Sequence, residues 1–288
     1  MRAMAKYPVG VAVPLGPLVT RVLAGNASPY THTGTQTHLV GTGALAVVDP
    51  GPDEPAHLDA LKRVIAGRPV AAILVTHTHR DHSPLAARLR DLTGAPVIGC
   101  APLTMDDEGP RADAAFDTDY APDRVLADGE RIEGDGWTIE AVGTPGHTSN
   151  HMAFALPEAQ ALFSGDHVMG WSTSIVSPPD GDMGDYMASL EKLLGRSETV
   201  YYPGHGEAVD NPQRLVRGML GHRKQREGQI VRLLARGTQR IEAMVEAMYV
   251  GLDARLKPAA ARSVLAHLIE LQKRGLAVAG EGGAWHAV

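Results

Sequence analysis

The sequence predicts an α/β fold, with strands and helices in alternation, followed by a smaller and mainly helical module. Apolar runs of strand length alternate with amphipathic helical segments through most of the chain. The charge then changes sign. Residues 220–288 carry 11 basic and 6 acidic residues, a net of +5, against −6 for the whole chain and therefore −11 for residues 1–219. We expect an acidic domain over residues 1–217 and a basic domain over residues 218–288.

The helices expected in the first domain are marked by apolar periodicity and by helix-starting residues. Leu58, Leu61 and Ile65 recur on one face of their segment, as in a helix packed on a sheet. Pro84 suits a helix start, because the N–H that proline lacks would have no partner there. These signals predict helices at residues 54–65, 84–92 and 183–194, between strands at residues 35–40, 44–48, 70–75, 137–142, 151–155, 161–164 and 199–202.

The second domain has the pattern of a winged helix, a fold that can read DNA through its third helix. Basic residues on or beside that helix are modest in number, and the acidic first domain opposes a nucleic-acid track. We therefore expect this domain to form a wall of the active site, and DNA binding is not expected. The predicted helices are residues 211–236, 241–249 and 258–274, the hairpin joins residues 275–280 to 284–288, and the basic residues are Lys257, Arg262, Lys273 and Arg274.

Three more basic residues, Arg223, Lys224 and Arg226, lie on the long helix that opens this domain. They could face a substrate anion within the wall, or they could form a solvated helix face. The solvated face is the favoured interpretation.

The densest group of metal-capable side chains lies in the octet VTHTHRDH at residues 75–82. His77, His79, Asp81 and His82 follow a predicted strand directly, in a loop of the kind that commonly holds catalytic groups. Imidazole and carboxylate together suit Zn²⁺ and related transition metals. One ion cannot easily accept all four side chains from so short a stretch. We therefore expect two metals, one bound by the first two histidines and one by the last two residues, which indicates hydrolysis.

Three later turns share one form, in which glycine and then a metal-capable residue follow an apolar strand. They deliver His147 in TPGHT, Asp166 in SGD and His205 in PGHG. Glycine allows the backbone to turn tightly and to approach a metal closely. As alternatives, the histidines could be ordinary turn residues and Asp166 could be a helix N-cap. Their order behind the HTHRDH motif favours metal binding.

The ordered set HTHRDH, TPGHT, SGD and PGHG resembles the metallo-β-lactamase superfamily, over about residues 35 to 206. The resemblance implies an αββα sandwich with metal ligands at one edge. Asp49 in VVDPG matches a residue that orients a ligand histidine, although it could be only a turn former. The resemblance further implies one metal on His77, His79 and His147, a second on Asp81, His82 and His205, and Asp166 as the bridge between them.

The expected function is that of a binuclear metal-dependent hydrolase with two Zn²⁺ ions, Mn²⁺ or iron being alternatives. The metals lower the pKa of a shared water toward ~7. The resulting metal-bound hydroxide attacks a carbonyl or phosphoryl centre, with Asp81 or Asp166 orienting the water. The second domain resembles that of the lactamase-like endoribonuclease subfamily, which favours a phosphodiester such as single-stranded RNA. A glyoxalase II-type thioesterase, a β-lactam or lactone hydrolase, and a DNA-binding regulator with a metal-sensing domain are the alternatives.

Composition agrees with a cytoplasmic enzyme that acts on a small molecule or a short RNA. No apolar N-terminal stretch predicts a secretory signal, and no stretch approaches the ~20 apolar residues of a membrane span. The single cysteine, Cys100, excludes an internal disulfide and fits a reducing compartment. Trp171 could be a pocket wall or a packing residue. The acidic segment at residues 105–123 is expected to be a solvated surface loop.

Overall fold

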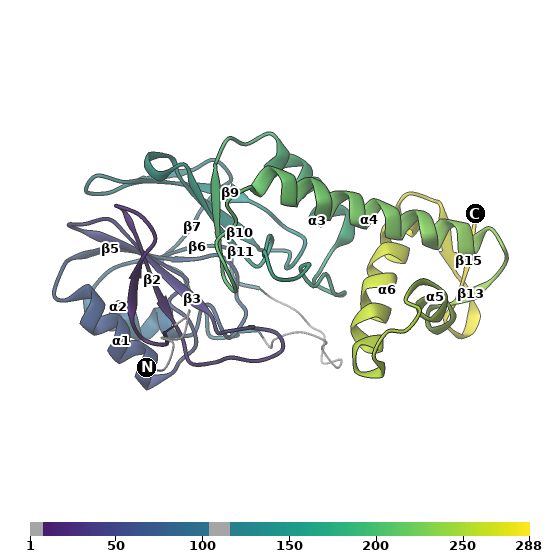
Figure 1. The fold of residues 1–288 in the computed structure, drawn as a ribbon, viewed down its shortest axis with the longest axis horizontal. Coiled ribbons are helices and arrows are strands. Elements are labelled where there is room, and N and C mark those ends of the chain that lie inside the picture. The colour runs from purple at the N-terminus through teal and green to yellow at the C-terminus, as the bar shows by residue number, and fades with distance from the viewer. Residues whose placement is uncertain (1–7, 104–115) are drawn as a thin grey trace, which may run out of the picture.

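The structure is a computed structural model that describes residues 8–103 and 116–288. Two β-sheets pack face to face with helices outside them, and one long helix leads from this body to a small separate domain (Figure 1). The arrangement is the predicted αββα sandwich followed by a winged helix. The N-terminal residues and the acidic residues Asp106, Asp107, Glu108 and Asp113, on which two expectations rested, lie outside the described residues.

The first sheet has seven strands in chain order. Its first four strands are antiparallel, and the pairs from β4 to β7 are parallel. Helices α1 (Pro55–Ile65) and α2 (Leu85–Thr93) cross over between parallel strands, which cannot be joined by a tight turn. The strands are β1 (Ala12–Pro14), β2 (Val19–Leu23), β3 (Gln36–Val40), β4 (Leu45–Val48), β5 (Val70–Val75), β6 (Val97–Gly99) and β7 (Arg124–Val125).

The second sheet has five strands in the order β12-β11-β10-β9-β8. Its central strand shows why both faces of the sheet are covered. Phe154 packs into the core between the sheets, whereas Ala153 and Ala155 lie in the core under the helices. Side chains alternate along a strand, so small residues on one face leave room for helices. The strands are β8 (Arg131–Glu133), β9 (Thr138–Gly143), β10 (Met152–Leu156), β11 (Ala161–Gly165) and β12 (Val200–Pro203), and the helices are α3 (Met183–Leu194) and α4 (Pro212–Leu234).

Helix α4 belongs to both domains. Its first half buries Val216 and Met219 against α3, and its second half buries Ile230 and Leu234 in the core of the small domain. The boundary predicted between residues 217 and 218 falls inside this continuous helix. The remaining elements are β13 (Gln239–Arg240), α5 (Ile241–Met248), α6 (Lys257–Lys273), β14 (Ala277–Ala279) and β15 (Ala284–Ala287), with short 3₁₀ turns at Pro157–Ala159, Ala254–Leu256 and Glu281–Gly283.

The third winged-helix helix, α6, lies against the catalytic body. Ala266 of α6 is buried in the same cluster as the apolar residues of α3. Near its end, Lys273 pairs with Asp182 at the start of α3, and Arg274 pairs with Glu227 of α4 at 2.8 Å. The face that could enter a DNA groove is therefore partly occupied by the body. No helix in the described ranges is long and apolar enough to cross a membrane.

Most predicted elements lie within one or two residues of the observed ones, but several strands were not predicted. The strands β7 and β13 have two residues each, which is too short to show an alternation of apolar and polar side chains in the sequence. Strand β8 has only the half-buried Ile132 between two exposed charged residues. In the acidic segment, Asp117 accepts a hydrogen bond from Ser83 and Asp123 accepts one from the backbone of Val97. The described end of this segment is therefore tied to the body.

Candidate metal centre

The predicted metal-binding residues converge at one edge of the sandwich, where strands from both sheets end. Strand β5 ends at Val75 and is followed at once by the HTHRDH loop, while the turns after β9, β11 and β12 supply the other three residues. The donor atoms form two groups, within each of which all lie within 4.8 Å of one another: His77, His79, His147 and Asp166 in the first, and Asp81, His82 and His205 in the second.

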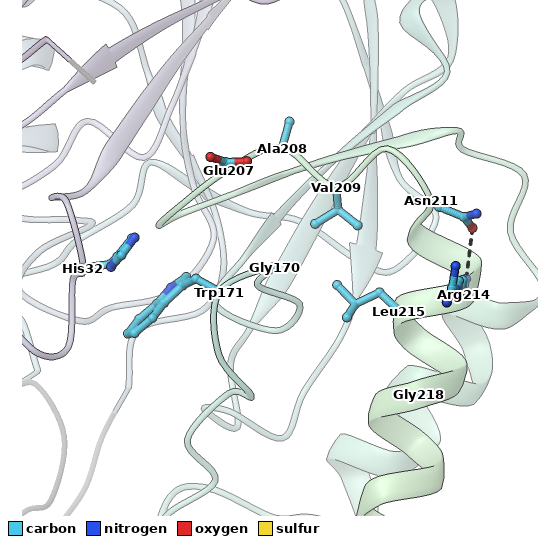
Figure 2. A pocket seen from close by; sticks show the side chains of 10 residues that line it. All are labelled: His32, Gly170, Trp171, Glu207, Ala208, Val209, Asn211, Arg214, Leu215 and Gly218. Atoms are coloured by element: carbon cyan, nitrogen blue, oxygen red, sulfur yellow. Dashed lines mark hydrogen bonds between the residues drawn. The ribbon is translucent and has the colours of Figure 1, made fainter. Parts of the chain in front are cut away.

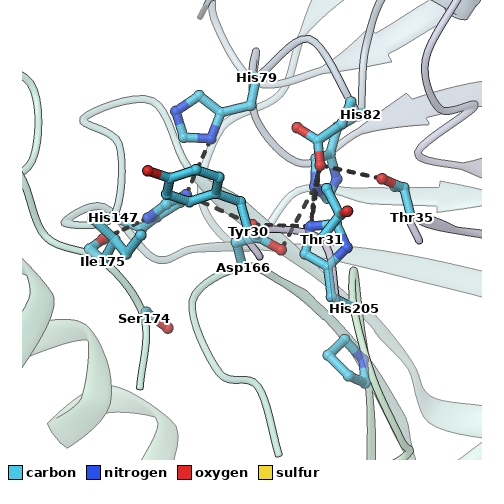
Figure 3. Close-up of polar contacts among 12 residues, drawn as sticks. Tyr30, Thr31, Thr35, His79, His82, His147, Asp166, Ser174, Ile175 and His205 are labelled. Carbon is cyan, nitrogen blue, oxygen red and sulfur yellow. Dashed lines mark hydrogen bonds and ion pairs between the residues drawn. The ribbon is translucent and has the colours of Figure 1, made fainter. Parts of the chain in front are cut away.

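In the first group, imidazole nitrogens meet at hydrogen-bond distance. His79 Nδ1 lies 3.0 Å from His77 Nε2 and 3.2 Å from His147 Nε2 (Figure 3 shows the second contact). A single N–H between three nitrogens cannot satisfy both contacts. The lone pairs that remain would repel one another, and a shared cation would remove this repulsion.

In the second group, two imidazoles and a carboxylate converge in the same way. His82 Nε2 lies 3.3 Å from His205 Nε2, and Asp81 Oδ2 lies 3.1 Å from His205 Nε2. Thr35 Oγ1 donates to the same Asp81 oxygen at 3.1 Å and so holds the carboxylate in place. The donor set, two nitrogens and one oxygen, is one that suits zinc and its neighbours.

Asp166 lies between the two groups. Its Oδ2 is 3.3 Å from His205 Nε2 and 3.9 Å from His147 Nε2, and its Oδ1 is 3.5 Å from His82 Nε2. Oδ1 is buried and has no hydrogen-bond partner among the described residues. Such an oxygen is costly unless a cation or a polar group satisfies it. The residues therefore fit a bound divalent metal. No helix begins at Asp166, so it is not an N-cap.

Each outward-facing ring nitrogen of three site histidines has its own acceptor. His82 Nδ1 donates to Asp49 at 3.0 Å, His147 Nδ1 to the carbonyl of Ile175 at 2.6 Å, and His205 Nδ1 to that of Gly34 at 3.2 Å. These contacts place a proton on Nδ1, so that Nε2 is the ring nitrogen that faces the site. The Asp49 carboxylate also accepts from the backbone N–H and the hydroxyl of Thr76, each at 2.8 Å.

Two neighbouring histidines support the site from behind. His151 Nε2 accepts the backbone N–H of Asp166 at 3.2 Å, and His151 Nδ1 contacts the Thr144 hydroxyl at 2.9 Å. His167 is fully buried against the ring of Tyr186, and burial lowers its pKa to about 3. His38 is a buried strand residue that packs on Phe163.

The protonation of the site differs between its two groups. Burial and the surrounding imidazoles lower the pKa of His77 far below its ordinary value and that of His79 to about 3. Burial alone would also lower the pKa of His205, but Asp166 and Asp81 raise it to about 9. His77 and His79 therefore present neutral imidazoles at pH 7, while a metal entering the second group must displace a proton.

A small cavity of about 60 Å³ opens onto these side chains. The walls that come from the loop before β3 were not predicted, because that loop has no periodicity and no metal-capable motif. The sequence left open whether Trp171 is a pocket wall or a packing residue. In the structure Trp171 lines the cavity. It stacks on His32, with ring centroids 4.7 Å apart and planes 10° from parallel. The other walls include Pro29, Tyr30, Thr31, Met169, Ser172 and Ile175.

The favoured interpretation of Arg223 as a solvated residue is wrong. Arg223 is only 4% exposed, and its guanidinium lies over the Tyr186 ring. Lys224 is exposed as expected and pairs with Glu191, while Arg226 is partly buried over the ring of Tyr249. Arg223 falls on the buried stripe of α4, three residues after Leu220 and seven before Ile230, and this helical spacing could have identified it.

Comparison with known proteins agrees with this geometry. Residues 31–205 match the Metallo-beta-lactamase superfamily, and residues 241–285 match the Beta-lactamase associated winged helix domain. Beta-lactamase-like protein 2 homolog of Drosophila melanogaster is 33% identical over 272 residues, which cover 89% of this chain and 88% of that protein. Atrochrysone carboxyl ACP thioesterase of Aspergillus fumigatus is 32% identical over 223 residues, 75% of this chain and 65% of that one.

Among solved structures, a beta-lactamase domain protein from Burkholderia ambifaria has the same fold, with a TM-score of 0.81 and 20% identity over 100% of this chain and 96% of that one. The described fold, the converging histidines and aspartates, and these matches agree. The chain therefore belongs to the metallo-β-lactamase superfamily of metal-dependent hydrolases and carries the associated winged helix domain.

Proposed function

We propose that this chain is a two-metal hydrolase, in which the first group of side chains binds one ion, the second group binds another, and Asp166 bridges them. The observation that supports this is the position of Asp166, whose two oxygens face histidines of both groups. When bound, two divalent cations, zinc in this proposal, supply Lewis acidity and bring the pKa of a shared water near neutrality.

The carboxylates of the site supply orientation. Burial alone would raise the pKa of Asp166, but His205 and His82 hold it well below its usual range, and His82 does the same for Asp81. The side chains of Asp166 and Asp81 are therefore both ionised at neutral pH and can accept hydrogen bonds from water. The hydroxyl of Thr35 fixes one oxygen of Asp81, which leaves the other oxygen to orient the attacking water.

The substrate class that the surroundings favour is an activated acyl group, a thioester above all. A groove of about 580 Å³ lies beside the metal centre, and Trp171 lines both this groove and the small cavity (Figure 2). Its walls are mostly apolar or uncharged, with Arg214 as the one cation and Glu207 as the one carboxylate among the described lining residues. A neutral carrier arm ending in an anion would suit such a groove.

The thioesterase name of the Aspergillus relative supports this substrate class. In this arrangement the acyl carbonyl lies at the metals, the carrier arm passes Trp171, and an anionic end reaches Arg214 in the first turn of α4. Helix N-termini favour negative charge, which adds to the attraction of the guanidinium. Burial keeps the one cysteine, Cys100, as a thiol by raising its pKa.

Single-stranded RNA is the second candidate, and one observation favours it. The His32–Trp171 stack and the exposed ring of Tyr30 present aromatic faces beside the metals, and bases stack on such surfaces. The acidic first domain disfavours a long RNA track, because phosphate binding depends on clustered basic residues. A role as a DNA-binding regulator is disfavoured by the contacts of α6 with the body.

A hydrolysis panel tests this proposal. An acyl-pantetheine thioester, a single-stranded RNA oligomer, a lactone and nitrocefin are each offered to metal-loaded protein, chelated protein and the His147→Ala variant. We expect metal-dependent thioester hydrolysis that the variant loses. Faster cleavage of RNA would make the phosphodiester the substrate class. If metal-loaded protein hydrolyses none of the four above the chelated control, this substrate assignment is wrong.

A further inference from the structure

We propose that the winged-helix domain positions the metal ligand His147 through two separate struts, Arg223 and Lys273. The inference rests on the two-metal assignment above. It concerns one of the two metals only, the ion bound by the group that contains His147. The domain would thus determine how tightly that ion is held, in addition to covering apolar surface.

The first strut runs from α4 to the backbone that fixes the His147 ring. Arg223 Nη2 donates to the carbonyl of Ser174 at 2.5 Å, and its Nη1 lies 3.5 Å from the Ser263 hydroxyl of α6. The next carbonyl along the chain, that of Ile175, accepts the Nδ1–H of His147 at 2.6 Å. The guanidinium therefore holds the peptide unit directly before the one whose oxygen orients the ligand ring.

Burial makes this contact more than a surface interaction. Arg223 is 4% exposed and has no carboxylate partner among the described residues, so that its charge is balanced by a carbonyl and the face of Tyr186. Tyr186 and Ser174 both donate from their hydroxyls to the carbonyl of His167, at 3.1 and 2.8 Å. Removing the guanidinium leaves the Ser174 carbonyl buried without its donor, and the loop must move to satisfy it.

The second strut runs from α6 to the turn that carries His147. Lys273 pairs with the carboxylate of Asp182, which caps α3 by accepting the backbone N–H of Asp185 at 2.9 Å. The backbone N–H of Asp182 donates to the carbonyl of Gly146 at 3.0 Å. Gly146 precedes the ligand and has a φ of +131°, a conformation that glycine adopts readily. Both the turn before His147 and the acceptor of its ring are thus tied to the winged-helix domain.

Within residues 8–103 and 116–288, the other metal group has no such tie. Its outer supports are Asp49, Gly34 and Thr35, all of which belong to the first sheet and the loop before β3. Loss of a strut should therefore weaken one metal site and leave the other unchanged. A merely structural role would lower both affinities together.

The test measures the two metal affinities of full-length protein by titrating metal-free chains with Zn²⁺ against a chelating dye. His147→Ala and His205→Ala assign each equivalent to its group. Arg223→Met keeps the length of the side chain but removes the donor, and Lys224→Met is its matched control on the same helix. Lys273→Ala tests the second strut, with Lys257→Ala as its control, because Lys257 pairs with Glu246 within the small domain.

We expect Arg223→Met to weaken the equivalent assigned to His147 by about 10- to 100-fold, the usual cost of losing a support behind a ligand. Lys273→Ala should weaken it by a few-fold, because the lysine is half exposed. The other equivalent should not change, and the Co²⁺ spectrum should alter at one site only. If Arg223→Met is insoluble, the same titrations of Arg223→Lys and Lys273→Ala test whether the affinity of the equivalent assigned to His147 falls alone. Unchanged affinities, or an equal fall at both sites, would overturn the inference, whereas loss of both metals in the two ligand variants would overturn the two-group assignment beneath it.

Discussion

The carboxylate of Asp49 holds the ring of His82 through a hydrogen bond of 3.0 Å to Nδ1. Asp49 has a φ of +50°, which is uncommon for a residue other than glycine, and both of its oxygens are occupied by Thr76. The uncommon backbone conformation thus lets one carboxylate contact both Thr76, at the end of β5, and His82. Both interpretations of Asp49 that the sequence allowed, turn former and orienting partner, describe the same residue.

This relationship predicts the effect of Asp49→Ala. His82 would lose the acceptor that fixes its tautomer, so the metal bound by the group containing His82 should bind about 10- to 100-fold more weakly. Metal titration followed by isothermal calorimetry measures the change. Asp53→Ala is the control, because Asp53 is exposed and pairs with the exposed Arg88. Equal affinities in both variants and the parent would show that Asp49 serves the turn alone.

The raised pKa of His205 predicts how metal affinity depends on pH. Below a pKa of about 9 the metal-free site carries a proton that an incoming ion must displace. Affinity for the ion of this group should therefore rise with pH as His205, and His82 whose pKa the same carboxylates also raise, lose their protons. In Asp166→Asn one carboxylate that raises both pKa values is gone, so metal binding should be weaker but should reach its plateau at lower pH. Chelator competition between pH 6 and about 9.5 measures both curves, and parallel curves would contradict the assigned cause.

Asp166→Asn should also change catalysis. The neutral amide cannot bridge two cations as a carboxylate does, so the shared water should keep a higher pKa and the pH–rate profile should move to higher pH. The measurement is kcat against pH at saturating metal. A variant with the parent's profile and full turnover would show that Asp166 is no bridge.

Arg214 should act on one class of substrate only. Arg214→Ala removes the cation of the groove beside Trp171, so the KM for an acyl thioester with an anionic carrier should rise several-fold. A short neutral thioester should be hydrolysed as before, because it does not reach the first turn of α4. Arg217→Ala, an exposed arginine of the same helix outside the groove lining, is the matched control. If both substrates respond alike, the groove does not bind the carrier.

Removal of the chain after Arg217 should impair the enzyme. It deletes Met219 and Leu220, which are buried against α3, and it deletes the Arg223 contact with Ser174. We expect aggregation or a strongly raised KM, since apolar surface would be exposed and one wall of the site would open. A soluble product with full metal content and the full-length rate would show that the winged helix has a separate role.

The residues that converge at the edge of the sandwich were easier to predict from the sequence than their surroundings, for a physical reason. Each of these candidate ligands follows a strand, beside its own glycine or within one dense motif, so that the local pattern is enough to find it. The His32–Trp171 stack joins segments that are far apart in the chain and leaves no periodic signal. Arg223 was misjudged because a charged residue on a helix suggests solvent, although its spacing places it on the buried stripe.

The fold was predictable where elements are long and periodic. Helix α3 lies where its periodicity predicted it, from Met183 to Leu194. The edge strands β7 and β8 escaped because exposed residues dominate them and their partners come from elsewhere in the chain. The boundary between the domains could not be read from charge, because the chain crosses it within one continuous helix.

The most direct test of this account is the number of metal ions per chain. Protein purified without chelator, loaded with Zn²⁺ and desalted, is analysed by plasma mass spectrometry beside His205→Ala. We expect a value approaching two equivalents in the parent, because Asp166 lies between two donor groups, and a value approaching one in the variant. A reproducible value near one in the parent, with no further loss in His205→Ala, would contradict the two-metal centre.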